Sequence, residues 1–346
     1  MTTLSGRAVS PQPALTSRFE SETVNNSGSS SRPVLGLVCI TATELIRFRT
    51  ITRTNYLKLS DEARELKLRE LYTGNLAKLL EALEFCAVTG IRLYRMSSQL
   101  FPMSDLEDGV GQRVMLELGG RFQEVGALAA RHGIRVVVHP EQFVVLSSDS
   151  ESVAANGVKI LSGHAQQFDL MGLAQSQWAM LLIHGGKAGR GDALAERITA
   201  LPENIRSRLT LENDEYAYGA AEILEVCRAA RVPMVFDAHH HVIHDKLLSY
   251  EDPSIAAFTQ AARDTWSDPT WQIVHLSNGK ERFSDRRHSD LIDEFPSAFL
   301  DVPFVEIEAK AKEIAIADLQ SRLEQPNPVL RVVREPPLEA AFPDLE

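Results

Sequence analysis

Seven segments of the chain place a metal-ligand residue at or just beyond the end of a short apolar run, and the residue type changes between segments. The segments are VVVHP, MLLIHGG, LTLEND, PMVFDAHHH, QIVHLS, FVEIEAK and RRHSD. In that order they supply His139, His184, Glu212, Asp237 with His240, His275, Glu308 and His288. Five imidazoles and three carboxylates at equivalent points predict an enzyme site that binds more than one metal ion.

The mixture of imidazole and carboxylate ligands, without cysteine, favours Mn²⁺, Zn²⁺ or Fe²⁺ over a structural zinc site. Eight ligands exceed the needs of one ion, and sites with several ions are characteristic of enzymes that cleave phosphoesters. In such sites one ion lowers the pKa of the attacking water, and its neighbours stabilise the charge that develops on the phosphate. Glu212, in the middle of the set, is predicted to bridge two ions.

The remaining histidines of the DAHHH region are interpreted differently. Asp237 and His240 are three residues apart and can face one site together, whereas His239, His241 and His244 lack that support, so we interpret them as loop residues or as supports of the ligands.

The ligands follow segments that have the near-continuous apolar pattern of strands buried on both faces. Eight such segments are predicted, at 34–40, 91–97, 135–140, 178–185, 209–214, 233–239, 271–277 and 304–310. Helical periodicity lies between them, at 61–88, 112–132, 220–233 and 310–323, with stop signals at Gly90, Gly133 and Pro233. Strand–helix alternation repeated eight times predicts an α/β protein with a single (β/α)₈ TIM-type barrel. In such a barrel the C-terminal ends of the strands converge on one face, where the active site forms.

The ends of the chain differ from the barrel in composition. Residues 1–33 are rich in Ser, Thr, Asn and Pro and are predicted to be a disordered tail, residues 34–322 form the barrel domain, and residues 323–346 form a Pro- and acid-rich, loosely attached tail. No apolar run is long enough to span a bilayer, and the start lacks an export signal. The three cysteines lie in apolar surroundings without CxxC spacing, which suits reduced thiols in the cytoplasm.

The formal charge of −11 argues against a protein that coats nucleic acid through a global positive field. Basic residues nevertheless follow two of the ligand-bearing strands, where they could contact phosphates: Lys187, Arg190, Lys280 and Arg286. Beyond His139, the pair Gln142 and Phe143 could act as a wedge, because an aromatic ring stacks on bases and an amide bonds to exposed base edges.

At this point the motifs resemble those of the UV damage endonuclease family, itself similar to abasic-site nucleases of the endonuclease IV type. The resemblance runs from Leu35 to Leu319 and rests on YRMSSQLFP, HPEQFVVLSS, IHGGKAGR, LEND, VFDAHHH, VHLSNG, HSDLI and EAKAKEIA, in the family's order and at similar spacing. It implies a barrel with two or three divalent ions, usually Mn²⁺, that cuts the phosphodiester bond immediately 5′ of a UV photoproduct.

The resemblance also implies roles for single residues. The first metal's ligands correspond to His139, His184 and Glu212, the second set to Glu212, Asp237, His275 and Glu308, and a third, weaker site to His240 and His288. The six residues of the first two sets are predicted to be catalytic. Gln142 and Phe143 match the family's damage-probing Gln-Tyr pair.

Several positions depart from the family pattern. Glu141 and Phe143 replace the Gly and Tyr of the family's HPGQY motif, and Leu37 replaces a Tyr thought to join the wedge. Met103 lies where the family has a His after LFP, and Asp105 is a candidate substitute for that ligand. Ile273 replaces a Lys. The central ligands match the family, while the damage-probing residues and those at the edge of the site differ. The resemblance therefore predicts metal binding more directly than it predicts a preference for UV photoproducts.

The leading hypothesis is a metal-dependent DNA repair endonuclease that acts on damaged double-stranded DNA, with abasic and other lesions as further substrates. One alternative is a sugar isomerase, epimerase or other metal-dependent TIM-barrel enzyme acting on a small molecule, against which the number of histidines argues. A non-catalytic DNA-binding relative is the third hypothesis, and the acidic charge argues against it. We expect a cytoplasmic monomer that associates with the nucleoid and not with membranes.

Overall fold

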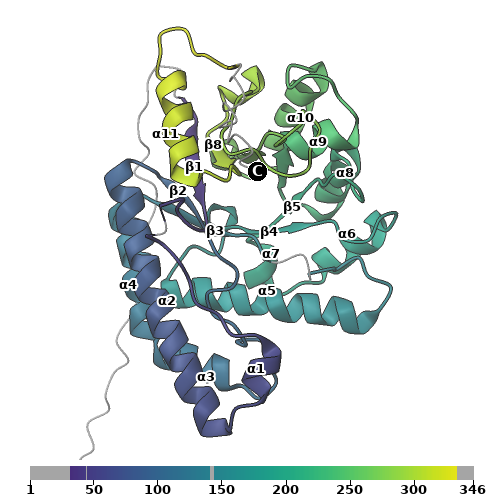
Figure 1. Ribbon diagram of the computed structural model, residues 1–346. Helices are drawn as coiled ribbons and strands as arrows, with labels where there is room; N and C mark the ends of the chain where they lie inside the picture. Colours follow the sequence, from purple (N-terminus) through teal and green to yellow (C-terminus); the bar gives the residue numbers. More distant parts are fainter. Residues whose placement is uncertain (1–31, 44, 141–143, 333–346) are drawn as a thin grey trace, which may run out of the picture. The chain divides into compact units, whose positions relative to one another are not determined.

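Eight parallel strands form a closed barrel in the computed structural model, which describes residues 32–43, 45–140 and 144–332 (Figure 1). The strands are β1 (Val34–Val38), β2 (Leu93–Met96), β3 (Arg135–Val138), β4 (Leu181–His184), β5 (Leu209–Glu212), β6 (Met234–Asp237), β7 (Ile273–Leu276) and β8 (Phe304–Ile307). Strand β8 closes the barrel on β1, with Val305 opposite Leu35. The predicted (β/α)₈ barrel and its eight strand segments are therefore confirmed.

Helices connect the strands and cover the outside of the barrel (Figure 1). The α-helices are α1 (Arg53–Leu57), α2 (Asp61–Thr89), α3 (Val110–Glu117), α4 (Gly119–Arg131), α5 (Glu151–Met171), α6 (Gly191–Thr199), α7 (Glu203–Arg206), α8 (Ala220–Ala230), α9 (Ala238–His244), α10 (Pro253–Arg263) and α11 (Lys312–Leu323). Three short 3₁₀ helices are η1 (Gln177–Ala179), η2 (Pro269–Trp271) and η3 (Ser297–Phe299).

Helix α2 begins and ends where the sequence predicts. Ser60 caps its N-terminus by accepting a hydrogen bond from the Ala63 amide, and Gly90 ends it with a φ of 78°. A left-handed residue at this position releases the chain from the helix, and glycine adopts that conformation without a steric cost.

Two predicted features differ from the structure. The helix expected over 112–132 is two helices, α3 and α4, separated at Leu118. The alternation is also incomplete, because the connection 277–303 between β7 and β8, which is described throughout, contains η3 and no α-helix. That connection is instead a long loop that carries His288.

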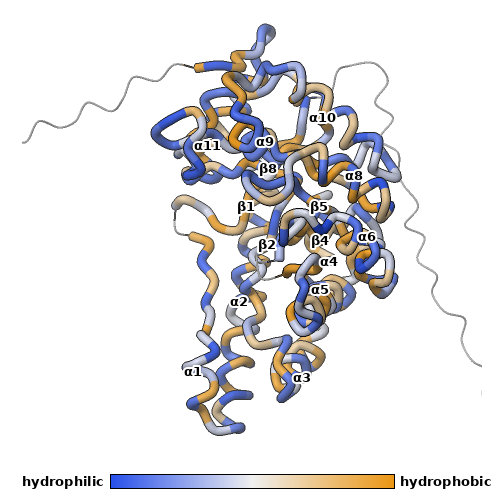
Figure 2. Tube along the Cα trace, turned by 90° about the vertical axis from the view of Figure 1, so that its right-hand side faces the viewer, coloured by the Kyte–Doolittle hydropathy of each residue, from blue (hydrophilic) through white to orange (hydrophobic). Residues whose placement is uncertain are grey.

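Two apolar layers hold the barrel together. Inside it, Leu93, Val137, Leu182, Val235 and Ile273 form a fully buried cluster. Outside it, a larger cluster fills the space between the strands and the helices, and hydrophilic and hydrophobic residues alternate along those helices (Figure 2). Because its interior is filled, the barrel is a packed core with the functional residues at its end.

The chain remains attached to the barrel beyond the end of α11. The Phe295 amide bonds to the Leu330 carbonyl, and the Val332 amide bonds to the Asp293 carbonyl. The start of the predicted C-terminal tail is thus more closely attached than expected, while 1–31 and 333–346 lie outside the described residues. All described residues belong to one compact unit that begins at Arg32. Within them, no helix combines the length and the apolar character needed to cross a bilayer.

Candidate metal centre

The predicted ligands gather at the C-terminal end of the barrel because each lies at or next to the end of a strand. His184, Glu212 and Asp237 are the last residues of β4, β5 and β6. His139 and Glu308 directly follow β3 and β8, and His275 lies in β7. Adjacent parallel strands bring these ends together, with His184 opposite Glu212 and Asp237 opposite His275.

The first group of ligand atoms consists of His139, His184 and Glu212, all within 4.8 Å of one another. The Nε2 atoms of His139 and His184 lie 3.1 Å and 3.7 Å from Oε2 of Glu212. His139 donates from Nδ1 to the Pro140 carbonyl at 2.9 Å, which leaves Nε2 as its ligand atom.

The second group consists of Glu212, Asp237 and His275. Nδ1 of His275 lies 2.8 Å from Oε1 of Glu212 and 3.5 Å from Oε1 of Glu308. The two oxygens of Glu212 therefore face different groups, with Oε2 toward the first and Oε1 toward the second. This is the geometry of a carboxylate that bridges two ions.

His240 and His288 lie at the edge of the second group. Nδ1 of His240 donates to the Asn213 carbonyl at 2.9 Å, so its Nε2 is available, 3.7 Å from Glu215. Nδ1 of His288 lies 3.8 Å from Glu308. Among the described residues no third group brings three ligand atoms as close together as the first two. Asp105 joins neither group.

The histidines differ in their electrostatic surroundings. Burial lowers the pKa of His184 to about 4, so this ring is neutral and able to bind a metal near pH 7. Burial also opposes protonation of His240, but the charges of Asp237 and Glu212 outweigh it and raise its pKa to about 9. Burial, together with the negative charges of Glu212 and Glu308, raises the pKa of Asp237. Such opposite shifts within one cluster are characteristic of functional sites.

The cluster contains more negative charge and more unpaired polar atoms than its own residues can satisfy. Of its four carboxylates, those of Glu306 and Glu308 contact the guanidinium of Arg95, whereas those of Glu212 and Asp237 lie among the histidines. Buried atoms without a hydrogen-bond partner include Nδ1 of His184 and Oδ2 of Asp237. Buried charge of this kind is costly unless it is paired or binds a metal. Divalent cations therefore fit this set of imidazoles and carboxylates.

Two members of this cluster, Arg95 and Glu306, were missed from the sequence. Glu306 is fully buried in β8, two residues before Glu308, and Arg95 is buried in β2. The alternation of two carboxylates in FVEIEAK is the signal that could have identified Glu306, because residues two apart in a strand face the same side.

The other histidines of the DAHHH region lie on helix α9 rather than in a loop. His239 is buried, with ring nitrogens 2.6 Å from the Tyr250 hydroxyl and 2.8 Å from the Asp285 carbonyl. His241 contacts the Ser254 hydroxyl at 3.0 Å. Both therefore have packing roles, while Asp237 caps the same helix by accepting from the His240 amide at 2.7 Å.

A cavity of about 620 Å³ opens beside the ligands, and its wall includes His139, His184 and His240. Lys187, Arg286 and the 60% exposed Tyr216 also line it. The Arg286 guanidinium lies 4.3 Å from the centre of the Tyr216 ring. The cavity thus combines candidate ligands with cations and an exposed aromatic ring.

The remaining predicted DNA-contact residues have mixed positions. Lys187 and Arg190 both form ion pairs with Asp149, and Lys280 is exposed in the loop after β7. Gln142 and Phe143, together with Glu141, lie outside the described residues.

Two positions that depart from the resembled family lie inside the protein. Leu37 is packed in the outer apolar core at 1% exposure. Ile273 belongs to the inner cluster. Met103 lies in the loop after β2 with a φ of 64°.

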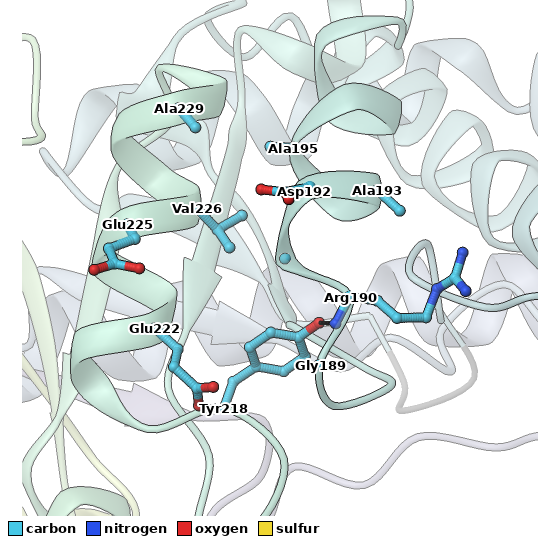
Figure 3. A pocket seen from close by; sticks show the side chains of 11 residues that line it. Gly189, Arg190, Asp192, Ala193, Ala195, Tyr218, Glu222, Glu225, Val226 and Ala229 are labelled. Atoms are coloured by element: carbon cyan, nitrogen blue, oxygen red, sulfur yellow. Dashed lines mark hydrogen bonds between the residues drawn. The ribbon is translucent and has the colours of Figure 1, made fainter.

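A second cavity, of about 590 Å³, lies between α6 and α8 and contains none of the predicted metal ligands (Figure 3). In it the Tyr218 hydroxyl accepts from the Arg190 amide at 3.2 Å and donates to the Lys187 carbonyl at 2.7 Å. The Arg190 side chain points away from Glu222 and Glu225 of α8 (Figure 3). Tyr218 therefore anchors the loop that carries the two cations.

Known proteins share both the sequence and the fold. The model of the UV-endonuclease UvdE family matches residues 33–336. The UV DNA damage endonuclease of Nostoc sp. is 53% identical over 291 residues, covering 84% of this chain and 90% of the relative. That of Deinococcus radiodurans is 52% identical over 289 residues, covering 83% and 95%. The crystal structure of SacUVDE aligns with a TM-score of 0.71 at 25% identity, covering 84% of this chain and 98% of that one.

Proposed function

Because the chain belongs to the UV-endonuclease UvdE family, and is thus an endonuclease and a hydrolase, we propose that it is a UV DNA damage endonuclease. It hydrolyses the phosphodiester bond 5′ of a UV photoproduct in damaged double-stranded DNA, with abasic and other lesions as further substrates. Residues 34–322 form the catalytic domain, between tails at 1–33 and 323–346. The observation that carries this proposal is Glu212, whose two oxygens face two separate groups of ligand atoms.

The residues of the cluster would hold two or three divalent ions. Mn²⁺ suits this mixed set of imidazoles and carboxylates, and Zn²⁺ or Fe²⁺ is compatible with it. One ion would be held by His139, His184 and Glu212, a second by Glu212, Asp237, His275 and Glu308, and a third, weaker one by His240 and His288. When bound, such ions make a water nucleophilic at neutral pH and stabilise the charge on the phosphate and the leaving oxygen.

The protein's own contribution is to hold these ligands in place before the substrate arrives. The Asn213 side chain donates from Nδ2 to the Asp237 backbone carbonyl, and its Oδ1 accepts from the Asp237 backbone N–H, both at 2.9 Å. The Asn213 carbonyl also accepts from His240. Since ligand orientation is fixed by bonds to the backbone, little reorganisation is needed when the site acts.

The rim of the cavity would bind the DNA. Arg286 and Lys187 offer cations for phosphates, and the exposed Tyr216 ring offers a surface on which a displaced base can stack. We propose Arg190 and Lys280, in the loops after β4 and β7, as further phosphate contacts. We propose Gln142 and Phe143, which lie outside the described residues, as the wedge that enters the duplex at the lesion, where unstacking costs least.

The protein is proposed to act as a monomer in the cytoplasm, associated with the nucleoid. A barrel that binds DNA across one end has no need of a second copy. Local cations on an acidic protein, with a charge of −11, limit binding away from the active face.

The test is a nicking assay with Mn²⁺-loaded protein on three supercoiled plasmids: UV-irradiated, depurinated and untreated. Glu212→Ala protein is the matched control against a contaminating nuclease. We expect nicking of the irradiated plasmid by the wild type alone. Nicking of depurinated plasmid only would overturn the photoproduct preference and keep the nuclease, whereas no nicking with metals bound would favour a small-molecule substrate.

A further inference from the structure

Two buried charged residues beneath the candidate ligands are not themselves part of the proposed ligand sets. Glu306 in β8 is 0% exposed and Arg95 in β2 is 6% exposed. Arg95 Nη1 lies 3.3 Å from Glu306, and Arg95 Nη2 lies 2.5 Å from Glu308. One guanidinium therefore links a candidate ligand, Glu308, to a buried carboxylate that does not line the cavity.

Glu306 also contacts the ring of His275. Oε2 of Glu306 lies 2.5 Å from Nε2 of His275, at an angle outside the range of an ordinary hydrogen bond. Two atoms that bind one divalent ion through bonds of about 2.0 Å, at an angle of 90° or more, lie at least about 2.8 Å apart, so this closer pair does not share an ion. Nδ1 of His275, on the other side of the ring, is thus the nitrogen that can bind a metal, and it is the one that faces Glu212.

This arrangement is costly for stability. Burying an ion pair removes both charges from water, and replacing such a pair with apolar residues of similar size is often neutral or stabilising. The polar atoms of Glu306, and Nη1 of Arg95, also lack hydrogen-bond partners of ordinary geometry. A pair that does little for stability needs another explanation, and its contacts are with two candidate ligands.

We propose that Glu306 and Arg95 are positioning residues of the metal centre. With a metal at Nδ1 the proton of His275 lies on Nε2, next to the Glu306 carboxylate, and Glu306 so favours the tautomer in which Nδ1 carries the lone pair toward the metal. Arg95 contacts Glu306 and Glu308 at once, and so aims Glu308 at the same ion. This role rests on the proposed function, because it assumes that His275 and Glu308 bind a metal.

The first measurement is Mn²⁺ affinity and stoichiometry, by titration calorimetry, for wild type, Glu306→Gln and Glu306→Leu. Removing a carboxylate behind a ligating histidine characteristically weakens metal binding 10- to 100-fold. We expect a loss of that size at one ion in Glu306→Leu and a smaller loss in Glu306→Gln, whose amide oxygen still accepts the Nε2 proton. Wild-type affinity in Glu306→Leu would overturn the proposal.

The second measurement identifies the ligating nitrogen. ¹⁵N histidine NMR of Zn²⁺-loaded protein should show a His275 ring with metal at Nδ1 and a proton at Nε2 in the wild type. In Glu306→Leu we expect a mixture of the two ligation modes. Zinc at Nε2 in the wild type would overturn the proposal, because the proposed contact with Glu306 would then not exist.

A double variant separates positioning from simple loss of structure. Arg95→Met/Glu306→Leu removes both charges, and we expect a melting temperature equal to or above that of the wild type, with metal affinity still weakened. A double variant that lost both stability and metal affinity together would indicate a structural role and overturn the proposal. These readouts need no DNA, so failure of the wild type to nick irradiated plasmid would count against the proposed function alone.

Discussion

Two arginines lie inside the barrel, one near each end, and their partners are of different kinds. Arg135, the first residue of β3, donates to the carbonyls of Trp178 and Trp271 at 2.7 Å and of Gln177 at 2.9 Å. Its guanidinium also lies 4.6 Å and 4.9 Å from the ring centres of Trp178 and Phe304. Arg95, at the opposite end, faces carboxylates instead.

The difference between the two ends separates structure from function. At the Arg135 end, the guanidinium is paired with backbone carbonyls and aromatic rings. Burial lowers the pKa of Arg135 to about 9, so the group stays charged at neutral pH. At the Arg95 end, four carboxylates exceed the local positive charge and buried atoms lack partners. The fully paired contacts of Arg135 stabilise the barrel, whereas the unpaired polar atoms near Arg95 are suited to bind cations.

The largest expected effect is at the Arg95 end of the barrel, where the candidate metal ligands lie. Glu212→Gln keeps the shape of the side chain but removes the charge shared by both ligand groups. We expect kcat for nicking irradiated plasmid to fall at least about a thousandfold, roughly 4 kcal/mol of transition-state stabilisation. The stabilisation of the wild type by Mn²⁺, about 2.7 kcal/mol at 100 times its Kd, should be lost in the same variant. A Mn²⁺-dependent melting shift that survives in Glu212→Gln would show that the two groups bind ions independently.

A substitution at the Arg135 end of the barrel should change the stability of the protein rather than its activity. Arg135→Met leaves three carbonyls without their donor and removes the contacts with Trp178 and Phe304. We expect the free energy of unfolding, measured in urea, to fall by about 3 to 4 kcal/mol. Mn²⁺ affinity of the folded variant should match that of the wild type. A fall in metal affinity would mean that the two ends are coupled, and the comparison would fail.

His164 provides a third environment, in which a histidine is buried without carboxylates in contact. Burial lowers its pKa from 6.5 to about 4, and its Nδ1 contacts Gln167 at 3.2 Å. The pKa of His240, among carboxylates, is raised instead. Because the folded pKa of His164 lies below the unfolded value, its neutral form stabilises the fold above pH 6.5. That contribution is lost as the pH falls toward 4.

We therefore expect wild type and His164→Gln to differ in the pH dependence of unfolding. Between pH 7 and pH 4 the wild type should lose roughly 3 kcal/mol more than the variant does. Urea unfolding across this range measures the difference curve. A flat difference curve would mean that the pKa of this ring is the same in the folded and unfolded states, and that burial does not lower it.

The contrast between the two ends also explains what could be predicted from the sequence. The strands and the eight candidate ligands were recognisable because each apolar run ends at a change of residue type, as at His184 and Glu212. Glu306 and Arg95 were not, since a lone charge within a strand has the same pattern whether it faces solvent or a charged partner across the barrel. Their roles depend on contacts between β2, β7 and β8, which are distant in sequence.

The smallest expected effect concerns the rim. Lys187 and Arg190 share Asp149, and the hydrogen bond from Lys187 lowers the pKa of that carboxyl group. Because Asp149 already neutralises part of their charge, a phosphate gains less from these cations than from free ones. We expect Lys187→Gln to weaken binding of duplex DNA about fivefold and to reduce the slope of log K against log salt by about 1.

Asp149→Asn should act in the opposite direction, because it releases both cations toward the phosphate. Lys78→Gln is the matched control, since Lys78 is exposed on α2 and pairs with Glu81. Fluorescence anisotropy at several salt concentrations measures all three variants. Equal slopes for Lys187→Gln and Lys78→Gln would remove this loop from the DNA interface. A steeper slope for Asp149→Asn would show that Asp149 restrains binding, and so limits attachment to undamaged DNA.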